Sequence, residues 1–499
     1  MGARTETAAL AGGLLALSFP PFPLGFLAHV AIAIVLLSMR GVSVRLAAWR
    51  GFVFGVVFHL ATIYWTGWVS VPGMFVMVVV LGLYLSLVFG AYAYARRVFG
   101  ERAVWLVPVI WTAHEYLRGL GDLAFPWTNL SLSQVDYLSL IQFADVTGDL
   151  GVSFWVVVVN VVVYQMIASA AAPHRRFIGS CAATIVLLFG LPFLYGWNAI
   201  NRLTTAETVR VAVLQGDIDS FHKWDSAYVD QSFAVYETQV REAAASGAEL
   251  IVLPETAAPV YLRTKTHHRR QLESIAEEIG VPMLIGTLEY ETVPEGGYLS
   301  YNAAVALDRD GFRPDYHAKL HLVPLGEWIP FSDRIKILDR LEVGGAHFTA
   351  GQKLVLFDHP QGPYAAAICF ESVFPDIIRR FTQKGARFLV NITNDGWYGM
   401  SSGPTQHAMI AVYRAIETRR PIARSANTGI SLFIDRAGRV QSASDQYVPD
   451  CLVRDLELGL PADSTFFVRH GMYFGRFCSI LAGAFLVGAA LMDRRRRAN

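Results

Sequence analysis

The segment Ala365-Ala366-Ala367-Ile368-Cys369-Phe370-Glu371-Ser372 is an apolar strand that ends at a cysteine, and a carboxylate follows two positions later. A cysteine at a strand end is most often a small buried hydrophobe. A neighbouring cation, however, stabilises its thiolate and makes it a strong nucleophile. The segment therefore predicts either a core cysteine or a catalytic one. The residues that could supply a cation and a base decide between the two.

Two other segments place an ionisable side chain where such a partner is needed. Glu255, in Leu253-Pro254-Glu255-Thr256-Ala257, directly follows an apolar strand and a proline. Lys319 lies in Tyr316-His317-Ala318-Lys319-Leu320-His321-Leu322-Val323-Pro324-Leu325-Gly326-Glu327, which is apolar enough to be half-buried. A buried lysine needs a carboxylate partner or loses its charge. Taken alone, each segment indicates only a surface glutamate or a lysine that reaches out to water.

Residues 200–470 read as a soluble domain in which strands alternate with helices, and this alternation indicates a layered α/β fold. We expect strands at Thr208–Asp217, Glu249–Leu253, Val281–Leu288, Asn302–Leu307, Leu354–Phe357, Tyr364–Cys369, Arg387–Ile392, Ala426–Ile434 and Val440–Ala443. We expect helices at Ser226–Ala245, Thr264–Ile279, Pro375–Lys384 and Gln406–Thr418.

The rest of the chain is dominated by apolar runs of about the 20 residues needed to cross the hydrocarbon layer. Single spans are predicted at Gly51–Val69, Gly73–Ala95, Ala103–Tyr116, Val152–Ala172, Phe177–Trp197 and Phe477–Met492. Thr7–Met39 is uncharged and carries prolines in its middle, which favours a hairpin of two short spans. A signal peptide at Met1–Phe19 is the alternative. Eight spans result, seven in residues 1–199 and one in residues 471–499.

Arginine clusters give the orientation. They lie at Arg40–Arg50, Arg96–Arg102, Arg175–Arg176 and Arg494–Arg497, and all fall on one face if every predicted span is real. Short loops rich in Lys and Arg stay in the cytoplasm. The domain of residues 200–470 is therefore expected outside the cytoplasm.

Net charge limits the possible binding partners, and the cysteine content bears on the state of Cys369. The formal net charge is +1, and no basic face interleaved with aromatics is present, so we expect no nucleic-acid partner. The outer domain holds two of the four cysteines, Cys369 and Cys451. A disulfide between them is the structural alternative to a reactive Cys369, because an oxidising compartment permits one.

In the order Glu255, Lys319, Cys369, the three segments resemble the nitrilase (carbon–nitrogen hydrolase) superfamily, as does Asn391-Ile392-Thr393-Asn394-Asp395-Gly396-Trp397. With eight spans around the domain, the whole chain resembles its membrane branch, the bacterial apolipoprotein N-acyltransferases. The resemblance implies an αββα sandwich, with no metal and no other cofactor.

The resemblance also implies roles for individual residues. Glu255 would be the general base for Cys369, and Lys319 would donate to the oxyanion. The remaining residues would support the site or contact substrate. Glu327 and Glu371 would hold Lys319 and the base in place, Trp224 and Phe370 would contact substrate, and Asn302 would line the site. Phe370 stands where the family has a tyrosine, which puts a hydroxyl role there in doubt.

The implied reaction moves an acyl chain from a phospholipid to a thioester on Cys369. The acyl chain then passes to the N-terminal α-amine of a diacylated apolipoprotein, on the periplasmic side of the bacterial inner membrane. Two alternatives remain open. A membrane-tethered nitrilase-type amidase would share all three catalytic residues but would need only one span. A non-catalytic lipid-binding or scaffold protein would not need Glu255, Lys319 or Cys369.

Overall fold

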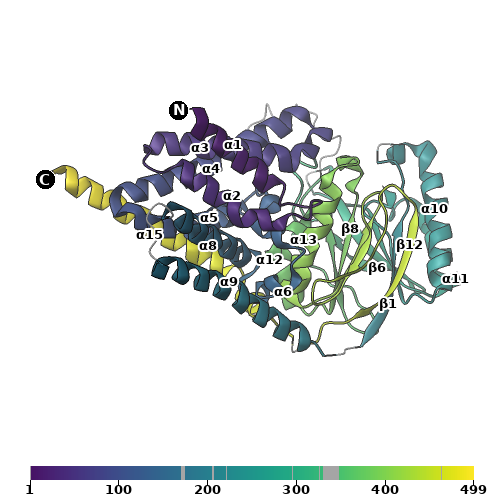
Figure 1. Ribbon diagram of the computed structural model, residues 1–499. Coiled ribbons are helices and arrows are strands. Elements are labelled where there is room, and N and C mark those ends of the chain that lie inside the picture. Colours follow the sequence, from purple (N-terminus) through teal and green to yellow (C-terminus); the bar gives the residue numbers. More distant parts are fainter. Residues whose placement is uncertain are drawn as a thin grey trace. The chain divides into compact units, whose positions relative to one another are not determined.

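The structure, a computed structural model, divides into two units. One unit is Met1–Arg202 with His470–Asn499, and the other is Leu203–Arg469. Helices make up the first unit, and the second contains the strands (Figure 1). The residues that the structure describes are 2–169, 175–204, 207–220, 222–294, 296–324, 326–329, 348–461 and 463–498.

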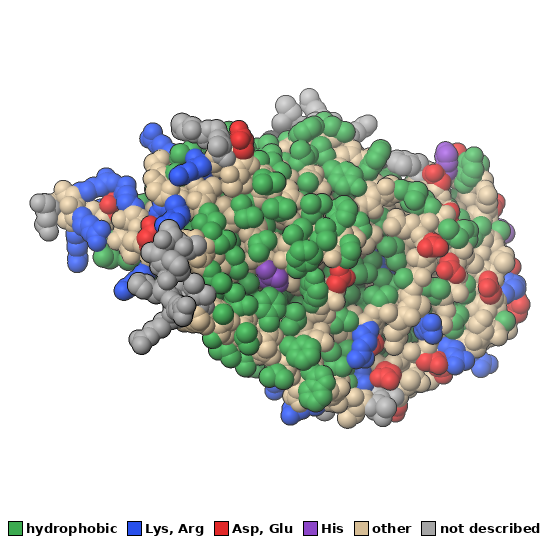
Figure 2. All heavy atoms as spheres, viewed as in Figure 1, with side chains coloured by type: hydrophobic (Ala, Val, Ile, Leu, Met, Phe, Trp, Pro, Cys, Tyr) green, Lys and Arg blue, Asp and Glu red, His purple; other side chains and the backbone are tan. Residues whose placement is uncertain are grey.

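The helical unit forms at the predicted apolar runs. Its helices are α1 (Gly2–Ala16), α2 (Ala28–Ser38), α3 (Val44–Ile63), α4 (Val71–Phe99), α5 (Val107–Arg118), α6 (Leu138–Ile141), α7 (Ala144–Thr147), α8 (Asp149–Ala168), α9 (Arg175–Asn201) and α15 (Tyr473–Ala498). Apolar side chains spread over its surface, and basic side chains gather at the end of α15 (Figure 2). This distribution matches a membrane-embedded surface with a charged end.

Among the described residues, five helical segments are long and apolar enough to cross a membrane: 44–68, 71–118, 149–168, 179–201 and 473–498. The second has 48 residues, which at 1.5 Å per residue is about 72 Å and more than twice the hydrocarbon thickness. Gly100, with φ of +72°, ends α4, so this segment contains two of the predicted passages. Residues 152–168 of the predicted span Val152–Ala172 belong to α8, and residues 170–172 lie outside the described residues.

The predicted N-terminal hairpin of two short helices is present as α1 and α2, which have 15 and 11 residues. At 1.5 Å per residue they reach about 22 and 16 Å, which is shorter than the roughly 30 Å hydrocarbon layer. The prolines between them use up the residues that two complete spans would need.

Small residues let α3 and α4 approach closely. A Cβ added at Gly51 would lie 2.8 Å from the Leu85 carbonyl oxygen, and one at Gly55 would lie 3.0 Å from Gly82 Cα. Glycines at a helix–helix contact allow the backbones to touch, which is how helices associate in lipid without a hydrophobic driving force. The two glycines therefore fix the packing of this helix pair.

The second unit is built on two sheets packed face to face. The first has the order β12-β1-β2-β4-β5-β6, with β3 also paired to β4, and the second has the order β11-β10-β9-β8-β7. Its strands are β1 (Thr208–Gln215), β2 (Leu250–Val252), β3 (Ala258–Tyr261), β4 (Met283–Thr292), β5 (Tyr298–Asp308), β6 (Gly311–Ala318), β7 (Tyr364–Ile368), β8 (Phe388–Thr393), β9 (Ile422–Ala426), β10 (Leu432–Ile434), β11 (Val440–Ala443) and β12 (Asp450–Glu457).

Two helices cover the outer face of each sheet. The first sheet packs against α10 (Ser226–Ala245) and α11 (Thr266–Ile279), and the second against α12 (Pro375–Gln383) and α13 (Ser402–Thr418) (Figure 1). The sheets meet through β1 and β9, where the Ser425 hydroxyl donates to the Leu214 carbonyl at 2.7 Å. The predicted αββα sandwich is thus confirmed.

The strand predictions fail at sheet edges and turns. Leu354–Phe357 forms only an isolated bridge to Tyr364, and Ala426–Ile434 divides into the end of β9, a turn and β10. The two edge strands of the first sheet, β6 and β12, were not predicted. β6 contains Pro314, which an edge strand tolerates but which argues against a strand in a sequence pattern.

Candidate active site

Cys369 lies where the sequence predicted it, directly after β7. It begins the 3₁₀-helix Cys369–Val373 with φ of +51°, a left-handed conformation that non-glycine residues rarely adopt. The side chain is buried and the thiol is free, as is Cys451, so the disulfide alternative is wrong. Burial, reinforced by the Glu255 carboxylate and opposed by Lys319, raises the pKa of the Cys369 thiol to about 12. The resting thiol is therefore protonated and needs a base.

Lys319 brings two of the predicted carboxylates together. Its Nζ donates to Glu327 Oε1 at 2.7 Å and to Glu255 Oε1 at 3.3 Å, and the lysine side chain is only 1% exposed. Burial disfavours the ammonium, but Glu255, Glu327 and Cys369 outweigh it and hold the pKa of Lys319 well above its ordinary value. Lys319 is thus a buried cation whose charge acts on the Cys369 thiol.

Asn302 on β5 joins the same two carboxylates. Its Nδ2 donates to Glu255 Oε1 at 2.7 Å and to Glu327 Oε1 at 3.2 Å, and the residue is buried. Asn302 is predicted to line the substrate site, and in the structure its amide is engaged with the two carboxylates. Glu327 is fixed further by the Val323 N–H, which donates to Oε2 at 2.8 Å.

Glu371 supports the site through the backbone. It accepts hydrogen bonds from the N–H groups of Ile368 and Leu320, both at 2.6 Å, and from His317 Nε2 at 3.2 Å. Burial opposes its charge, but His317 and the two N–H groups keep the pKa of Glu371 below its ordinary value. Ile368 precedes Cys369, and Leu320 follows Lys319. Glu371 therefore holds Lys319 through the neighbouring peptide and not, as expected from the sequence, by pairing with its ammonium.

A substitution at Glu371 is expected to loosen both strand ends. Glu371→Gln places an amide NH₂ where carboxylate oxygens accept bonds, so we expect a loss of about 1.5–3 kcal/mol in unfolding free energy, as for a hydrogen bond to a charged group. Thioester formation should also slow, because Cys369 and Lys319 lose their common anchor. Thermal unfolding and a burst measurement of Cys369 acylation check this. The exposed Glu277→Gln serves as the control, and equal behaviour of both variants would contradict the assignment.

The two predicted substrate contacts differ in exposure. Trp224, which ends the 3₁₀-helix His222–Trp224, is 41% exposed and available to a ligand. Phe370 is buried, with its ring centroid 5.1 Å from that of Phe374 and 5.9 Å from that of His321. Phe370, which follows Cys369 in the chain, thus packs within an aromatic cluster.

A buried ionic network that was not predicted lies beneath Cys369. Asp395 Oδ1 lies 2.8 Å from His407 Nδ1, and Arg424 donates to Asp395 Oδ2 at 2.7 Å. His407 Nε2 lies 3.2 Å from the Cys369 carbonyl oxygen. Burial opposes the charge of Asp395, yet Arg424 and His407 lower its pKa to about 2. Asp395 belongs to the Asn391–Trp397 motif, so the motif signalled the network, but its partners are distant in sequence.

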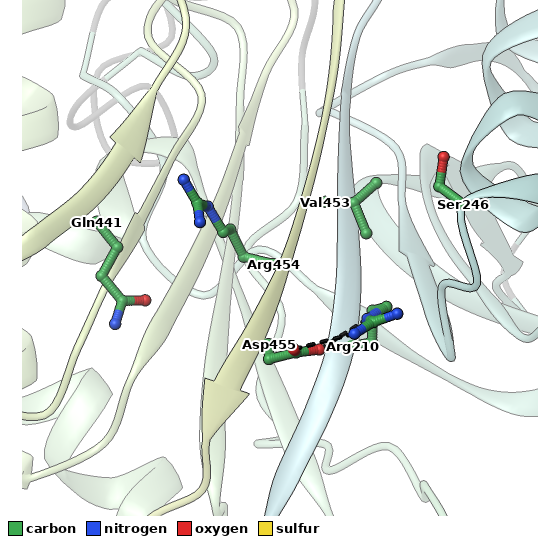
Figure 3. A pocket seen from close by; sticks show the side chains of 6 residues that line it. All are labelled: Arg210, Ser246, Gln441, Val453, Arg454 and Asp455. Carbon is green, nitrogen blue, oxygen red and sulfur yellow. Dashed lines mark hydrogen bonds and ion pairs between the residues drawn. The ribbon is translucent and has the colours of Figure 1, made fainter.

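The surface pocket in Figure 3 is separate from this site. It is lined by Arg210, Ser246, Gln441, Val453, Arg454 and Asp455. Arg210 lies at the start of β1 and pairs with Asp455, whereas Glu255 and Cys369 follow the carboxyl ends of β2 and β7. In open α/β sheets ligands bind at the carboxyl ends of parallel strands. Within the described ranges no group of His, Cys, Asp and Glu side chains is placed to hold a metal ion.

Known proteins match both units. A model of the carbon-nitrogen hydrolase family matches residues 210–461, and a model of the apolipoprotein N-acyltransferase N-terminal domain matches residues 11–162. Among solved structures, an amidase of the nitrilase superfamily from Nesterenkonia has a TM-score of 0.41 and 18% identity, covering 55% of this chain and 99% of that one.

Curated relatives match along nearly the whole chain. An apolipoprotein N-acyltransferase of Geobacter metallireducens is 35% identical over 503 residues, covering 98% of this chain and 95% of that protein. One of Chlorobaculum tepidum is 31% identical over 521 residues, covering 97% and 96%. These matches confirm the resemblance found in the sequence, and the chain belongs to the apolipoprotein N-acyltransferase family.

Proposed function

We propose that this chain transfers an acyl group from a phospholipid to the N-terminal α-amine of diacylglyceryl-cysteine in apolipoproteins, through a thioester on Cys369. The names of the relatives support the acceptor, and the site supports the covalent route. Glu255, Lys319 and Cys369 are proposed as the catalytic residues. Glu327 and Glu371 are proposed as their supports, and Trp224 as a substrate contact.

In the first step the Cys369 thiol gives its proton to Glu255 and the sulfur attacks the ester carbonyl carbon. Lys319 faces the oxygen that becomes negative in the tetrahedral intermediate. When the intermediate collapses, the carbon–oxygen ester bond breaks, and the lysophospholipid alcohol leaves with the proton from Glu255. The acyl group remains on Cys369 as a thioester.

In the second step the neutral α-amine of the acceptor attacks the thioester carbonyl. Glu255 accepts a proton from the attacking nitrogen, an amide forms, and the carbon–sulfur bond breaks. Cys369 recovers its proton, so no oxidant, reductant or cofactor is consumed. Water must stay out during the interval, because it would hydrolyse the thioester.

The observation that carries the proposal is the position of Lys319 between the two carboxylates and the Cys369 thiol. A buried ammonium held by Glu255 and Glu327 gives a fixed positive charge near the sulfur. The test is intact-mass analysis of the full chain after incubation with phospholipid. An acyl adduct on Cys369, lost when a diacylglyceryl peptide is added, supports the proposal. Ammonia release from amides without an adduct from phospholipid would favour a tethered amidase.

We also propose that residues 200–470 lie on the periplasmic side of a bacterial inner membrane. Arg96 donates to the carbonyls of Met39 at 2.7 Å and Val42 at 3.1 Å, and Arg97 pairs with Asp493. The helix ends that carry three of the predicted arginine clusters therefore share one end of the helical unit. The positive-inside rule assigns that end to the cytoplasm. The chain before α15 then belongs to the opposite side.

Labelling in intact cells checks this orientation. A tag after Asn499 should be reached only from the cytoplasm, whereas the exposed Ala245→Cys should react with a membrane-impermeant maleimide added outside, once the outer membrane is permeabilised. The unsubstituted chain, whose cysteines are buried or partly buried, gives the background. Reaction of Ala245→Cys only after lysis would reverse the orientation and remove the lipoprotein substrate.

A further inference from the structure

A second buried lysine lies beside the catalytic carboxylate. Lys223 belongs to the 3₁₀-helix His222–Trp224 and is 2% exposed. Its Nζ donates to the Thr256 hydroxyl, lies 3.5 Å from the Thr256 carbonyl oxygen and sits 5.4 Å from the centroid of the Trp224 ring. Thr256 follows Glu255 and has φ of +49°, so Lys223 fixes the peptide that aims the proposed base.

Lys223 has no ion-pair partner of its own within the part of the chain that the structure describes. Burial lowers its pKa to about 8, and the charge that opposes this shift is the Glu255 carboxylate. An unpaired buried ammonium is unfavourable unless a nearby group gains from it. Since Nζ contacts only neutral oxygens and a ring, the gain must come from charges slightly farther away.

The catalytic cluster lacks one positive charge. Among the described residues, Glu255 and Glu327 form ion pairs with one cation, Lys319, which leaves a net charge of −1 when all three are ionised. Two other buried carboxylates nearby have their own partners: Glu371 accepts from two backbone N–H groups and His317, and Asp395 pairs with Arg424. Lys223 is the cation that brings the catalytic cluster to neutrality.

We propose that Lys223 is a positioning residue for the acyl transfer. Its charge offsets the negative charge that remains after Glu255 and Glu327 pair with Lys319, and its hydrogen bond to the Thr256 hydroxyl orients the neighbouring Glu255. The inference rests on the proposed function only in the role of Glu255. Lys223 and the candidate substrate contact Trp224 are neighbours in the same 3₁₀-helix. Through Lys223, this helix connects substrate binding at Trp224 with proton transfer at Glu255.

The pH dependence of Cys369 alkylation tests this role of Lys223. Among the described residues, the charged and titratable groups that face Glu255 are Lys223, Lys319, Glu327, Cys369 and Tyr398. Removing one cation from this set disfavours the carboxylate form, so the base is lost at a higher pH. A merely structural role would instead lower the rate by the same factor at every pH.

The experiment measures the rate of Cys369 alkylation by iodoacetamide in the full chain between pH 5 and pH 9, read by peptide mass spectrometry. Lys223→Gln keeps a donor for Thr256 without the charge. We expect its acidic limb to move up by about one pH unit, with rates about tenfold below the unsubstituted protein on that limb and converging above it. Lys223→Arg should keep the limb in place. The exposed Lys265→Met should leave the whole profile unchanged.

An unmoved limb in Lys223→Gln, or a uniform loss at all pH values, would overturn the inference. If Lys223→Gln folds poorly, Lys223→Met, which keeps the volume, takes its place in the same measurement. The experiments distinguish failure of the proposed function from failure of the role of Lys223. Absence of an acyl adduct in the unsubstituted protein would sink the proposed function, whereas alkylation reports on Glu255 and Lys223 without any lipid.

Discussion

Cys369→Ala is expected to give neither an acyl adduct from phospholipid nor any product with a diacylglyceryl peptide. The substitution removes the sulfur that forms the covalent bond, and the buried site offers no second thiol, because Cys451 lies on β12 beside the Gln239 carbonyl. Positioned acid–base catalysis contributes about 10²–10⁴-fold and an oxyanion donor about 10²–10³-fold, but both act here on an attack that can no longer occur.

The measurement is intact mass together with chromatographic detection of the N-acylated peptide. Cys451→Ala is the matched control, since it deletes the other thiol of the same unit, and it should retain both signals. Cys369→Ser should bind substrate but acylate below detection, because a serine hydroxyl is far harder to deprotonate than a thiol. Transfer that persists in Cys369→Ala would exclude a thioester mechanism altogether.

Much of the site was predictable because each catalytic side chain follows a pattern within a few residues. Cys369 ends an apolar strand, Glu255 follows another, and Lys319 interrupts an apolar run. Glu255 and Lys319 follow strands of the first sheet and Cys369 follows a strand of the second, so the packing of the two sheets brings these strand ends together. Sequence alone did not give the partners. Glu371 joins Ile368 to Leu320, which are 48 positions apart, and no local pattern marks a carboxylate that binds two peptide groups.

Buried charges were the harder part to predict. Lys223, His407 and Arg424 look like ordinary polar residues in sequence, and only packing places them in the interior. The positions of the membrane helices were easier to predict, because apolar composition alone indicates where they form. The lengths of α1 and α2 were harder to predict, because they depend on where the chain turns.

Lys319→Met is expected to produce the second-largest change, in both rate and stability. Loss of the donor that faces the oxyanion should slow thioester formation by about 10²–10³-fold. The substitution also leaves Glu255 and Glu327 buried side by side without their cation. Breaking a buried ion pair by removing one partner costs about 3–5 kcal/mol. The thermal unfolding midpoint of the full chain in detergent should therefore fall by roughly 10 °C.

A double variant separates the two effects. Lys319→Met with Glu327→Gln removes one of the two opposed carboxylates, and the glutamine amide oxygen can still accept from the Val323 N–H. Most of the lost stability should return, because Glu255 no longer faces a second negative charge. The rate should not return, because nothing then faces the oxyanion. If the double variant regained the rate along with the stability, Lys319 would matter only as a counter-ion for the carboxylates, and the oxyanion donor would have to be sought among the backbone N–H groups after Cys369.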